Sequence, residues 1–457
     1  MVTVALYGLE VDDWNALERE VVDLFTALLR VDTTNPPGNE TACALVLQDY
    51  LAGNGIASTL VGESPQRQNL VARLDGARPG PTLTYMGHMD VVPADAGEWS
   101  VPPFAGVVKD AYVWGCGATD MKNQVAAEAV ALARLKRSGA DFAGTVKYAA
   151  TVDEEVGDHC GVRWLCRNEP DTLRSEYLVN EGMGGLWLQV GGQKVFLLAA
   201  AEKAFAQFRI RTRGRGGHAS VPEKERSAVI DLARAVVALG LYDPPAIVSP
   251  LTAQFIDAVV TEAGLRARLK DPGTARAAGA DLRRLDAELA SLVEPLLGAT
   301  FTPTMLDAGK AVNVIPTRAE ASIDCRILPE MTAAGTAELV AAVLDPLGID
   351  WELEWIDSTT PNASPAPTAL SESIARVVRG DFPDAVLAPM CSGSFTDSRW
   401  VRERFPDCIA YGFAPYVAES FHAMRGGRDH EPDERIRVED VTYQALFFER
   451  LARELLA

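Results

Sequence analysis

Short buried strands alternate with amphipathic helices along the first half of this 457-residue chain. Apolar runs at residues 83–86, 146–150 and 177–179 have the length of buried strands. A helical pattern with one apolar face follows Asp120 and ends near Gly139. Strands that alternate with helices predict an α/β fold, in which a mostly parallel sheet is covered by helices on both faces.

The pattern changes at residue 204. Residues 204–211 alternate between apolar and polar side chains, which is typical of a half-buried strand. The elements expected after it are a helix, two strands, a helix and a strand, at 225–240, 312–315, 319–328, 332–346 and 351–356. Leucines at helical spacing between residues 282 and 296 add a helical insertion at about 241–310. These elements predict a β-α-β-β-α-β unit, a small open sheet with two helices on one face.

The length of the chain favours two domains, because one hydrophobic core rarely serves so many residues. We place the β-α-β-β-α-β unit as an inserted domain at residues 204–357. The other domain then consists of residues 1–203 and 358–457.

Charge and composition exclude several classes of protein. A formal net charge of −20 leaves no basic footprint for nucleic acid. No stretch reaches the roughly 18 apolar residues of a membrane helix, and the first 24 residues lack the pattern of a secretory signal. The seven cysteines include no Cys-x-x-Cys pair, which disfavours a disulfide framework and a thiolate zinc site. We therefore expect a cytoplasmic protein with reduced, buried thiols.

Acids and histidines follow directly on the predicted strands. They are His88 and Asp90 after the first strand, Glu154 and Glu155 after the second, and Glu181 after the third. Positions i and i+2 of a strand share a face, so the Asp90 carboxylate can orient the His88 imidazole. The carboxyl ends of such strands are where open α/β sheets bind ligands. We expect these side chains to lie together.

Two further residues have the same chemistry. Asp120 lies in a glycine-rich turn before a predicted helix, where its alternative role is that of a helix N-cap. His430 lies between acids near the end of the chain. A solvated loop is the alternative explanation for the adjacent acids Glu154 and Glu155.

Histidine nitrogens and carboxylate oxygens together suit zinc, with cobalt or manganese as alternatives. Four or five such ligands exceed the needs of one tetrahedral ion, so a carboxylate that bridges two ions is the simpler arrangement. Two ions about 3.5–4 Å apart can hold a bridging hydroxide as the nucleophile. One carboxylate must stay off the ions to take the proton. The residues alone do not decide which of Glu154 and Glu155 is the ligand and which is the base.

In these residues the chain resembles metallopeptidase family 20. This family includes aminoacylase, carboxypeptidase G, acetylornithine deacetylase and succinyl-diaminopimelate desuccinylase. The resemblance extends from residue 31 to residue 430. Its motifs, in chain order, are Gly-His-Met-Asp at 87–90, Asp-Met-Lys at 120–122, Asp-Glu-Glu at 153–155, Asn-Glu-Gly at 180–182, Gly-His-Ala-Ser at 217–220 and the histidine at 430.

The resemblance implies a zinc-exopeptidase-like catalytic domain and a role for each matching residue. The implied metal ligands are His88 and Glu181 for one ion, Glu155 and His430 for the other, and Asp120 as the bridge. The resemblance further implies that Asp90 orients His88 and that Glu154 is the general base and later the acid.

The inserted domain would pair two subunits in a homodimer, as the resemblance implies. His218 would reach the partner's active site and stabilise the tetrahedral oxyanion, a contribution of about 10²–10³ in rate by comparison with other oxyanion donors. The alternative for His218 is a surface position in a glycine-rich turn.

Arg326 alternates with apolar residues on its strand and points away from the apolar face. A guanidinium in that position can grip a substrate carboxylate through two hydrogen bonds. The resemblance supports this role and adds Asn313 as an assistant. The alternative is an exposed salt bridge from Arg326 to Asp324 or Glu320.

The turn that contains Gly393 and Ser394 stands where relatives have a glycine-rich contact to the substrate carboxylate. Departures from the family occur at Cys116, where relatives often have arginine, and at Asn123, where they often have glycine. None of the proposed ligands is lost, so the departures leave hydrolysis in place and the substrate open.

The sequence therefore predicts a metal-dependent hydrolase of an amide bond adjacent to a free carboxylate, in an N-acyl amino acid, a dipeptide or a C-terminal residue. Two alternatives are a two-metal phosphodiesterase and a non-catalytic module that binds a metal or a peptide. A phosphodiesterase would need basic residues beside the metals, and the segments around 88, 120, 154 and 181 contain few arginines. Loss of Glu154 or His218 would indicate a non-catalytic module, and both are present.

Overall fold

A computed structural model describes residues 7–139, 141–157, 159–222, 226–424 and 428–457. The chain divides into two compact units. The large unit comprises Met1–Ala200, Ser364–Met390 and Thr396–Ala457, and the inserted unit comprises Ala201–Ala363 and Cys391–Phe395. None of the described helices has the length and apolar character needed to cross a membrane.

The large unit is built around a sheet with the strand order β1-β2-β6-β3-β7-β17-β9-β16, and β8 pairs with β9. These strands are β1 (Ser58–Val61), β2 (Asn69–Asp75), β3 (Arg78–His88), β6 (Ala143–Thr151), β7 (Tyr177–Asn180), β8 (Trp187–Val190), β9 (Gln193–Glu202), β16 (Val386–Ser392) and β17 (Ile409–Gly412). The central strands β6, β3, β7 and β17 are parallel, whereas β1, β2, β8 and β9 pair in antiparallel fashion. The predicted α/β fold with a parallel centre is confirmed.

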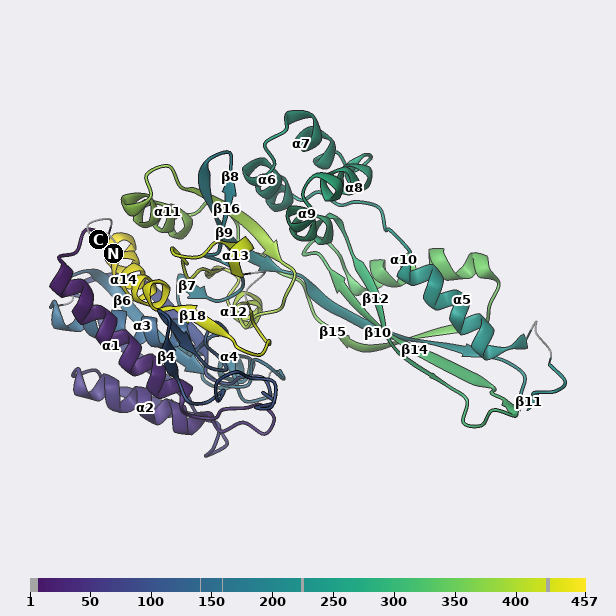
Figure 1. Cartoon of the computed structure of the whole chain (residues 1–457), viewed down its shortest axis with the longest axis horizontal. Coiled ribbons are helices and arrows are strands. Elements are labelled where there is room, and N and C mark those ends of the chain that lie inside the picture. Colours follow the sequence, from purple (N-terminus) through teal and green to yellow (C-terminus); the bar gives the residue numbers. More distant parts are fainter. Residues whose placement is uncertain (1–6, 140, 158, 223–225, 425–427) are drawn as a thin grey trace. The chain divides into compact units, whose positions relative to one another are not determined.

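Helices cover both faces of this sheet. They are α1 (Val11–Leu29), α2 (Glu40–Gly53), α3 (Lys122–Arg137), α4 (Val162–Asn168), α11 (Ala369–Asp381), α12 (Ser398–Arg404), α13 (Phe421–Met424) and α14 (Val438–Leu455). Helices α1, α3 and α14 pack together (Figure 1). Tyr148 of β6 points toward them and donates a hydrogen bond to the carbonyl of Val125 in α3. Lys147, the preceding residue, points to the opposite face of the sheet. It donates hydrogen bonds to the carbonyls of Asp171 and Arg174, which follow α4.

A small three-stranded sheet, β18-β5-β4, completes the large unit. Its strands are β4 (Val107–Lys109), β5 (Tyr112–Trp114) and β18 (Arg435–Arg437). The pairing of β18 with β5 is antiparallel and joins two segments that are more than 300 residues apart in the chain. It brings the turn before α3 next to the segment that contains His430.

The inserted unit is a four-stranded antiparallel sheet with the order β12-β14-β10-β15. Its elements are β10 (Ala204–Arg213), β11 (Gly217–His218), α5 (Ala228–Gly240), α6 (Pro250–Val259), α7 (Ala263–Leu269), α8 (Ala275–Leu285), α9 (Ala287–Val293), β12 (Thr300–Ala308), β13 (Val314–Ile315), β14 (Arg318–Ile327), α10 (Ala333–Leu344) and β15 (Trp351–Ser358). Helices α5 and α10 lie on one face of the sheet (Figure 1). The predicted β-α-β-β-α-β order is present.

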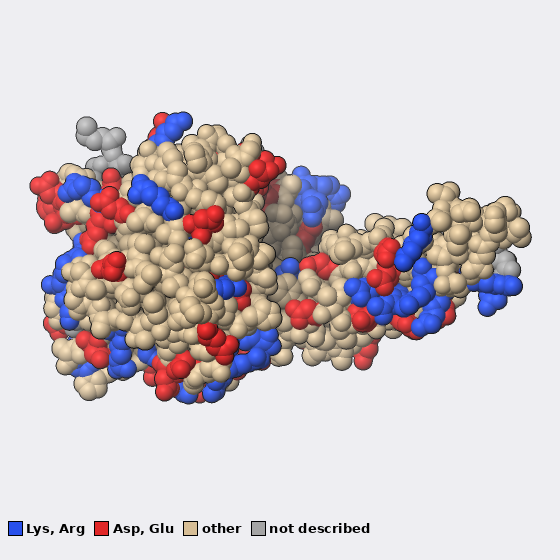
Figure 2. All heavy atoms as spheres, turned by 90° about the horizontal axis from the view of Figure 1, so that it is seen from below, with Lys and Arg blue, Asp and Glu red and all other residues tan. Residues whose placement is uncertain are grey.

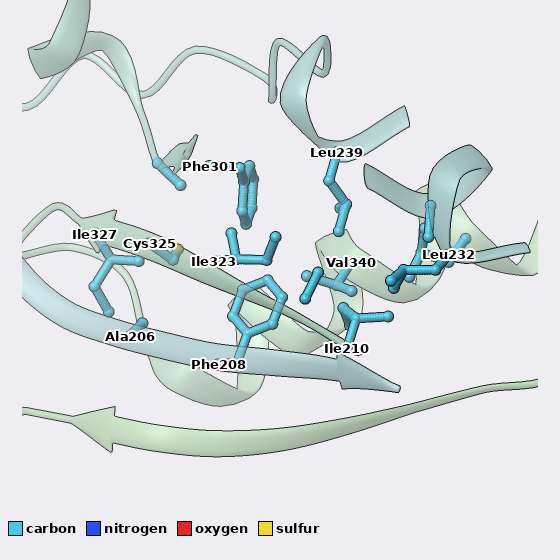
Figure 3. Packing of buried hydrophobic residues seen from close by; sticks show 14 of the residues in the cluster. Ala206, Phe208, Ile210, Leu232, Leu239, Phe301, Ile323, Cys325, Ile327 and Val340 are labelled. Carbon is cyan, nitrogen blue, oxygen red and sulfur yellow. The ribbon is translucent and has the colours of Figure 1, made fainter. Parts of the chain in front are cut away.

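The core of the inserted unit lies between the sheet and the helices α5 and α10. Strand β10 alternates buried and half-buried residues, as its sequence predicts. Figure 3 shows Phe208 of β10, Ile323 of β14 and Phe301 of β12 packed on one another, with Leu239 of α5 beside them. The rings of Phe208 and Phe301 meet edge to face, with centroids 6.3 Å apart. Burial of these side chains supplies the hydrophobic stabilisation of this unit.

The opposite face of this sheet is covered by charges that pair with one another. Arg211 lies 3.1 Å from Glu320, which also lies 3.3 Å from Arg209. Arg213 lies 2.7 Å from Glu352 on the neighbouring strand. Figure 2 shows basic and acidic side chains interleaved on this unit. Each charge compensates its neighbour, so the face has little net charge.

One detail of the predicted inserted unit is wrong, whereas the predicted helical insertion is present as helices α6 to α9. The second strand of the sheet is β12, at Thr300–Ala308, whereas residues 312–315 contribute only β13, which pairs with β11 in a separate two-stranded ribbon. The leucine pattern at 282–296 is divided between helices, because Asp286 ends α8 and accepts a hydrogen bond from Leu289 N at the start of α9.

Candidate metal centre

Three neighbouring parallel strands end beside one another at the centre of the large sheet. Strand β3 ends at His88, which is in register with Thr151, the last residue of β6. Glu154 and Glu155 follow β6 directly, and Glu181 follows β7. The sheet order β6-β3-β7 therefore presents a histidine between two segments that carry carboxylates. This arrangement agrees with the position predicted from the sequence.

Asp120 lies between two histidines. Its Oδ1 is 3.0 Å from Nε2 of His88, and its Oδ2 is 3.2 Å from Nε2 of His430. Asp120 belongs to the turn before α3, and His430 belongs to the segment before β18. Nε2 of His430 is also 3.1 Å from Oε2 of Glu155. A single carboxylate thus connects both imidazoles, as a bridging ligand must.

The remaining carboxylates complete the cluster. Oε1 of Glu181 is 3.6 Å from Nε2 of His88. Ligand atoms lie within 4.8 Å of one another in two groups, one of His88, Asp120 and Glu155 and one of His88, Glu154 and Glu181. The structure brings together all the residues predicted as metal ligands and the predicted base.

Asp90 contacts both His88 and the segment that carries the acidic pair. Nδ1 of His88 lies 3.0 Å from the backbone carbonyl of Asp90 and 3.5 Å from its carboxylate. That carboxylate accepts hydrogen bonds from the backbone N–H groups of Glu154 and Glu155, at 3.2 and 3.1 Å. Asp90 therefore holds the imidazole on one side and the acidic pair on the other.

Asn35, which the sequence motifs do not identify as a site residue, is part of this support. The Asn35 side-chain amide donates to Asp90 at 2.9 Å and to Asp153 at 3.1 Å. Arg67 lies 3.0 Å from Asp153 and also forms a salt bridge with the buried Glu40. Asn35 lies within the stretch of the family resemblance, but its partners are 55 and 118 residues away in the chain, so the sequence alone does not identify them.

Electrostatics indicates that the cluster is suited to cations. Burial, together with the neighbouring Glu181, raises the pKa of Glu154 well above its ordinary value, and burial also raises the pKa of Glu181. Hydrogen bonds to Asp120 and Glu155 raise the pKa of His430 to about 11. Oε1 of Glu155 is buried and has no hydrogen-bond partner among the described residues. Protons on these groups compensate the acids, and divalent ions would displace such protons.

Two of the predicted substrate-side residues lie together in the inserted unit. The ribbon of β11 and β13 pairs His218 with Val314, and the backbone N–H of Ala219 donates to the carbonyl of Asn313 at 3.0 Å. His218 and Asn313 are both exposed. Nδ1 of His218 lies 2.8 Å from the hydroxyl of Ser220. Nε2 is the other ring nitrogen and is not engaged in this contact.

The other substrate-side residues lie elsewhere in the same unit. Arg326 is half-buried, and its Nε and one terminal nitrogen donate to Asp324, which is the salt bridge named as the alternative. Its guanidinium also lies 4.1 Å from the ring centre of Phe205. Gly393 and Ser394 are exposed.

The fold and the histidine–carboxylate cluster define a metal-dependent hydrolase. A family model described as Peptidase family M20/M25/M40 matches residues 84–454, and the chain belongs to this family. The chain is 28% identical over 373 residues to succinyl-diaminopimelate desuccinylase from Methylobacterium radiotolerans, with 79% of each chain covered. It is 27% identical over 391 residues to probable carboxypeptidase S-like 2 from Dictyostelium discoideum, covering 81% of this chain and 71% of that protein.

The fold also matches a solved structure. The crystal structure of an M20 family metallo-carboxypeptidase from Sulfolobus solfataricus superposes with a TM-score of 0.72 at 17% sequence identity. The match covers 96% of this chain and 100% of that chain. The family resemblance and the enzyme class predicted from the sequence are confirmed.

A buried acid beside the cluster predicts how the stability of the metal-free protein depends on pH. Burial raises the pKa of Asp397 to about 8, from an ordinary value near 4. Above pH 4 the folded state then binds more protons than the unfolded state, so stability falls as the pH rises toward 8. We expect the urea midpoint of chelator-treated protein to be lower at pH 8 than at pH 5.

The variant Asp397→Asn provides the comparison. Asp397→Asn removes one titrating group, so the folded variant takes up roughly one proton fewer than the folded parent. The urea midpoint of the variant should therefore fall less between pH 5 and pH 8. Equal midpoints of the parent protein at pH 5 and pH 8, or an equally large fall in the variant, would contradict the assignment.

Proposed function

We propose that this enzyme hydrolyses an amide bond adjacent to a free carboxylate, in an N-acyl amino acid, a dipeptide or a C-terminal residue. The observation that carries the proposal is the position of Asp120 between His88 and His430, with the carboxylates of Glu154, Glu155 and Glu181 around it. The names of the relatives, a desuccinylase and carboxypeptidases, support amide substrates of this kind.

Two divalent ions fit the residues of the cluster. His88 and Glu181 would hold one ion, Glu155 and His430 would hold the other, and Asp120 would bridge them. The unpartnered Oε1 of Glu155 supports this assignment, because a buried carboxylate oxygen needs a partner. Mixed nitrogen and oxygen ligands favour Zn²⁺, with Co²⁺ or Mn²⁺ as alternatives. When bound, the ions would polarise the amide carbonyl and lower the pKa of water.

Glu154 is assigned as the general base. Glu155 faces His430 at 3.1 Å, which suits a shared ion, whereas Glu154 lies in the group with His88 and Glu181. The Asp90 carboxylate fixes the backbone of Glu154 and so sets the direction of its side chain. Glu154 takes a proton from the attacking water and then delivers it to the leaving nitrogen.

Residues of the inserted unit would recognise the substrate. Arg326 would bind the free carboxylate through the guanidinium edge that Asp324 does not occupy. Asn313 would assist, and the turn with Gly393 and Ser394 would supply further polar contacts. His218 would donate a hydrogen bond to the developing oxyanion from the partner subunit.

The edge strand β12 supports a homodimer through the inserted unit. β12 lies at one edge of the four-stranded sheet, and the side chains of Met305 and Leu306 on it are each 68% exposed. Val312 and Val314, close by in the chain, are also exposed. An unpaired edge with exposed apolar side chains favours pairing with another chain, here a second copy. Such pairing is how His218 would reach the active site of a partner.

The thiols support a cytoplasmic location. All seven cysteines are unpaired in the structure, and all except Cys160 are buried. Unpaired thiols persist in reducing compartments.

The base assignment predicts a separation of metal binding from turnover. Glu154→Gln should retain bound zinc and lower kcat by about 10²–10⁴, since only the proton transfer is lost. Turnover is measured on N-acyl amino acids and dipeptides, and zinc by elemental analysis. Chelation of the parent enzyme should abolish hydrolysis, and Zn²⁺ or Co²⁺ should restore it. Full activity of a metal-free preparation would refute the proposed function, and retained turnover in Glu154→Gln would place the base elsewhere.

The role of His218 predicts complementation between inactive subunits. His218→Ala and Glu154→Gln should each be inactive alone. The two variants are dissociated, mixed in equal amounts and allowed to reassociate, so that half of the dimers contain one subunit of each variant. Each mixed dimer has one complete site out of two. Activity should therefore recover to about a quarter of the parent value. Mixing Glu154→Gln with itself is the control. Failure of the mixture to gain activity, with mixed dimers verified by mass, would contradict a contribution from the partner subunit.

A further inference from the structure

The carboxylate of Glu434 is buried, with 2% of the residue exposed, and gathers hydrogen bonds from the turn that ends at Asp120. Its Oε2 accepts from the backbone N–H of Gly117 at 2.8 Å. Its Oε1 accepts from the backbone N–H and the hydroxyl of Thr119, at 2.6 and 2.9 Å, and from the backbone N–H of Asp120 at 3.1 Å. Both carboxylate oxygens are therefore used in holding this turn.

The backbone of Glu434 holds the same turn from the other direction. Its carbonyl accepts a hydrogen bond from Gly115 N at 3.1 Å, which extends the pairing of β18 with β5. Glu434 stands four residues after His430, on the segment that leads into β18. One residue thus joins the segment of His430 to the turn of Asp120, whose side chains meet at 3.2 Å.

The chemistry of the contacts requires a carboxylate. All the groups that hydrogen-bond to the Glu434 side chain are donors, and a carboxylate is an acceptor at both oxygens. A glutamine in its place would keep one acceptor oxygen. Its NH₂ group is a donor and would face one of the other donors, so that hydrogen bond would be lost. Because these donors precede α3, the positive end of the helix dipole also favours a negative charge at this position.

We propose that Glu434 is a positioning residue that sets the distance between Asp120 and His430, and thereby the affinity of the centre for divalent ions. This inference rests on the proposed metal centre. Glu434 touches neither ion nor substrate in this proposal, and it acts through the backbone of Asp120 and through the segment of His430. Supporting residues of metal ligands commonly change metal affinity by about 10–100-fold when they are substituted.

The test is a titration of metal-free protein with Co²⁺, followed by the visible absorption of the bound ion. Glu434→Gln should bind Co²⁺ about 10–100-fold more weakly and show a shifted spectrum, because the ligand geometry is altered. Glu434→Asp keeps a carboxylate that is one methylene shorter, and it should give an intermediate affinity. Glu431→Gln, the same charge change on an exposed neighbour, should bind Co²⁺ as the parent protein does.

The outcomes separate this inference from the proposed function. Absence of Co²⁺ binding by the parent protein would refute the metal centre itself. Parent-like affinity and spectrum in Glu434→Gln would overturn the positioning role alone. An equal loss in Glu431→Gln would also overturn it, because the cause would then be charge. If circular dichroism shows that Glu434→Gln is unfolded, Glu434→Asp decides: weaker binding with a shifted spectrum supports the role, and parent-like binding overturns it.

Discussion

The large unit gathers several carboxylates at the ends of its central parallel strands, and these carboxylates repel one another. The rest of the site must compensate this repulsion. Glu154, Glu155 and Glu181 are brought close by the order of β6, β3 and β7, and Asp120 is brought to them from the turn before α3. Two buried carboxylates hold three of these residues in place by accepting hydrogen bonds from their backbone N–H groups. Asp90 fixes the backbone after β6, and Glu434 fixes the turn of Asp120. Such a cluster is stable when cations compensate it.

The strands that form the centre of the large unit could be predicted because burial on both faces leaves continuous apolar runs in the sequence. The inserted sheet could be predicted only in part. Strand β12 contains Pro303, at which the pairing with β14 shifts register, and it exposes Met305 and Leu306 at an edge. An edge strand tolerates proline, and every residue of β12 after Pro303 is exposed, so its sequence has only a weak strand pattern. Three of the residues 312–315 are apolar, but Val312 is fully exposed and precedes β13, and Val314 of β13 is exposed as well.

The ligands at the strand ends, His88, Glu155 and Glu181, could be predicted because each ends or follows a buried strand of the central sheet. Asp120 and His430 could be singled out only by residue type and by the family resemblance. The supporting residues could not be predicted, because their contacts join distant parts of the chain. Glu434 reaches Gly117 across 317 residues, and Asn35 reaches Asp153 across 118. The sequence also left Glu154 and Glu155 equivalent. The distance of 3.1 Å from Glu155 to His430 supports different roles for the two, a distinction that needs coordinates.

The central claim is a centre of two metal ions bridged by Asp120. It is tested most directly by anomalous diffraction at the zinc absorption edge, from crystals of the zinc-loaded protein. A two-ion centre predicts two anomalous peaks about 3.5–4 Å apart. One would lie between His88 and Glu181, the other between Glu155 and His430, with Asp120 between them. Peaks at other residues, or none at this cluster in an active preparation, would contradict the claim.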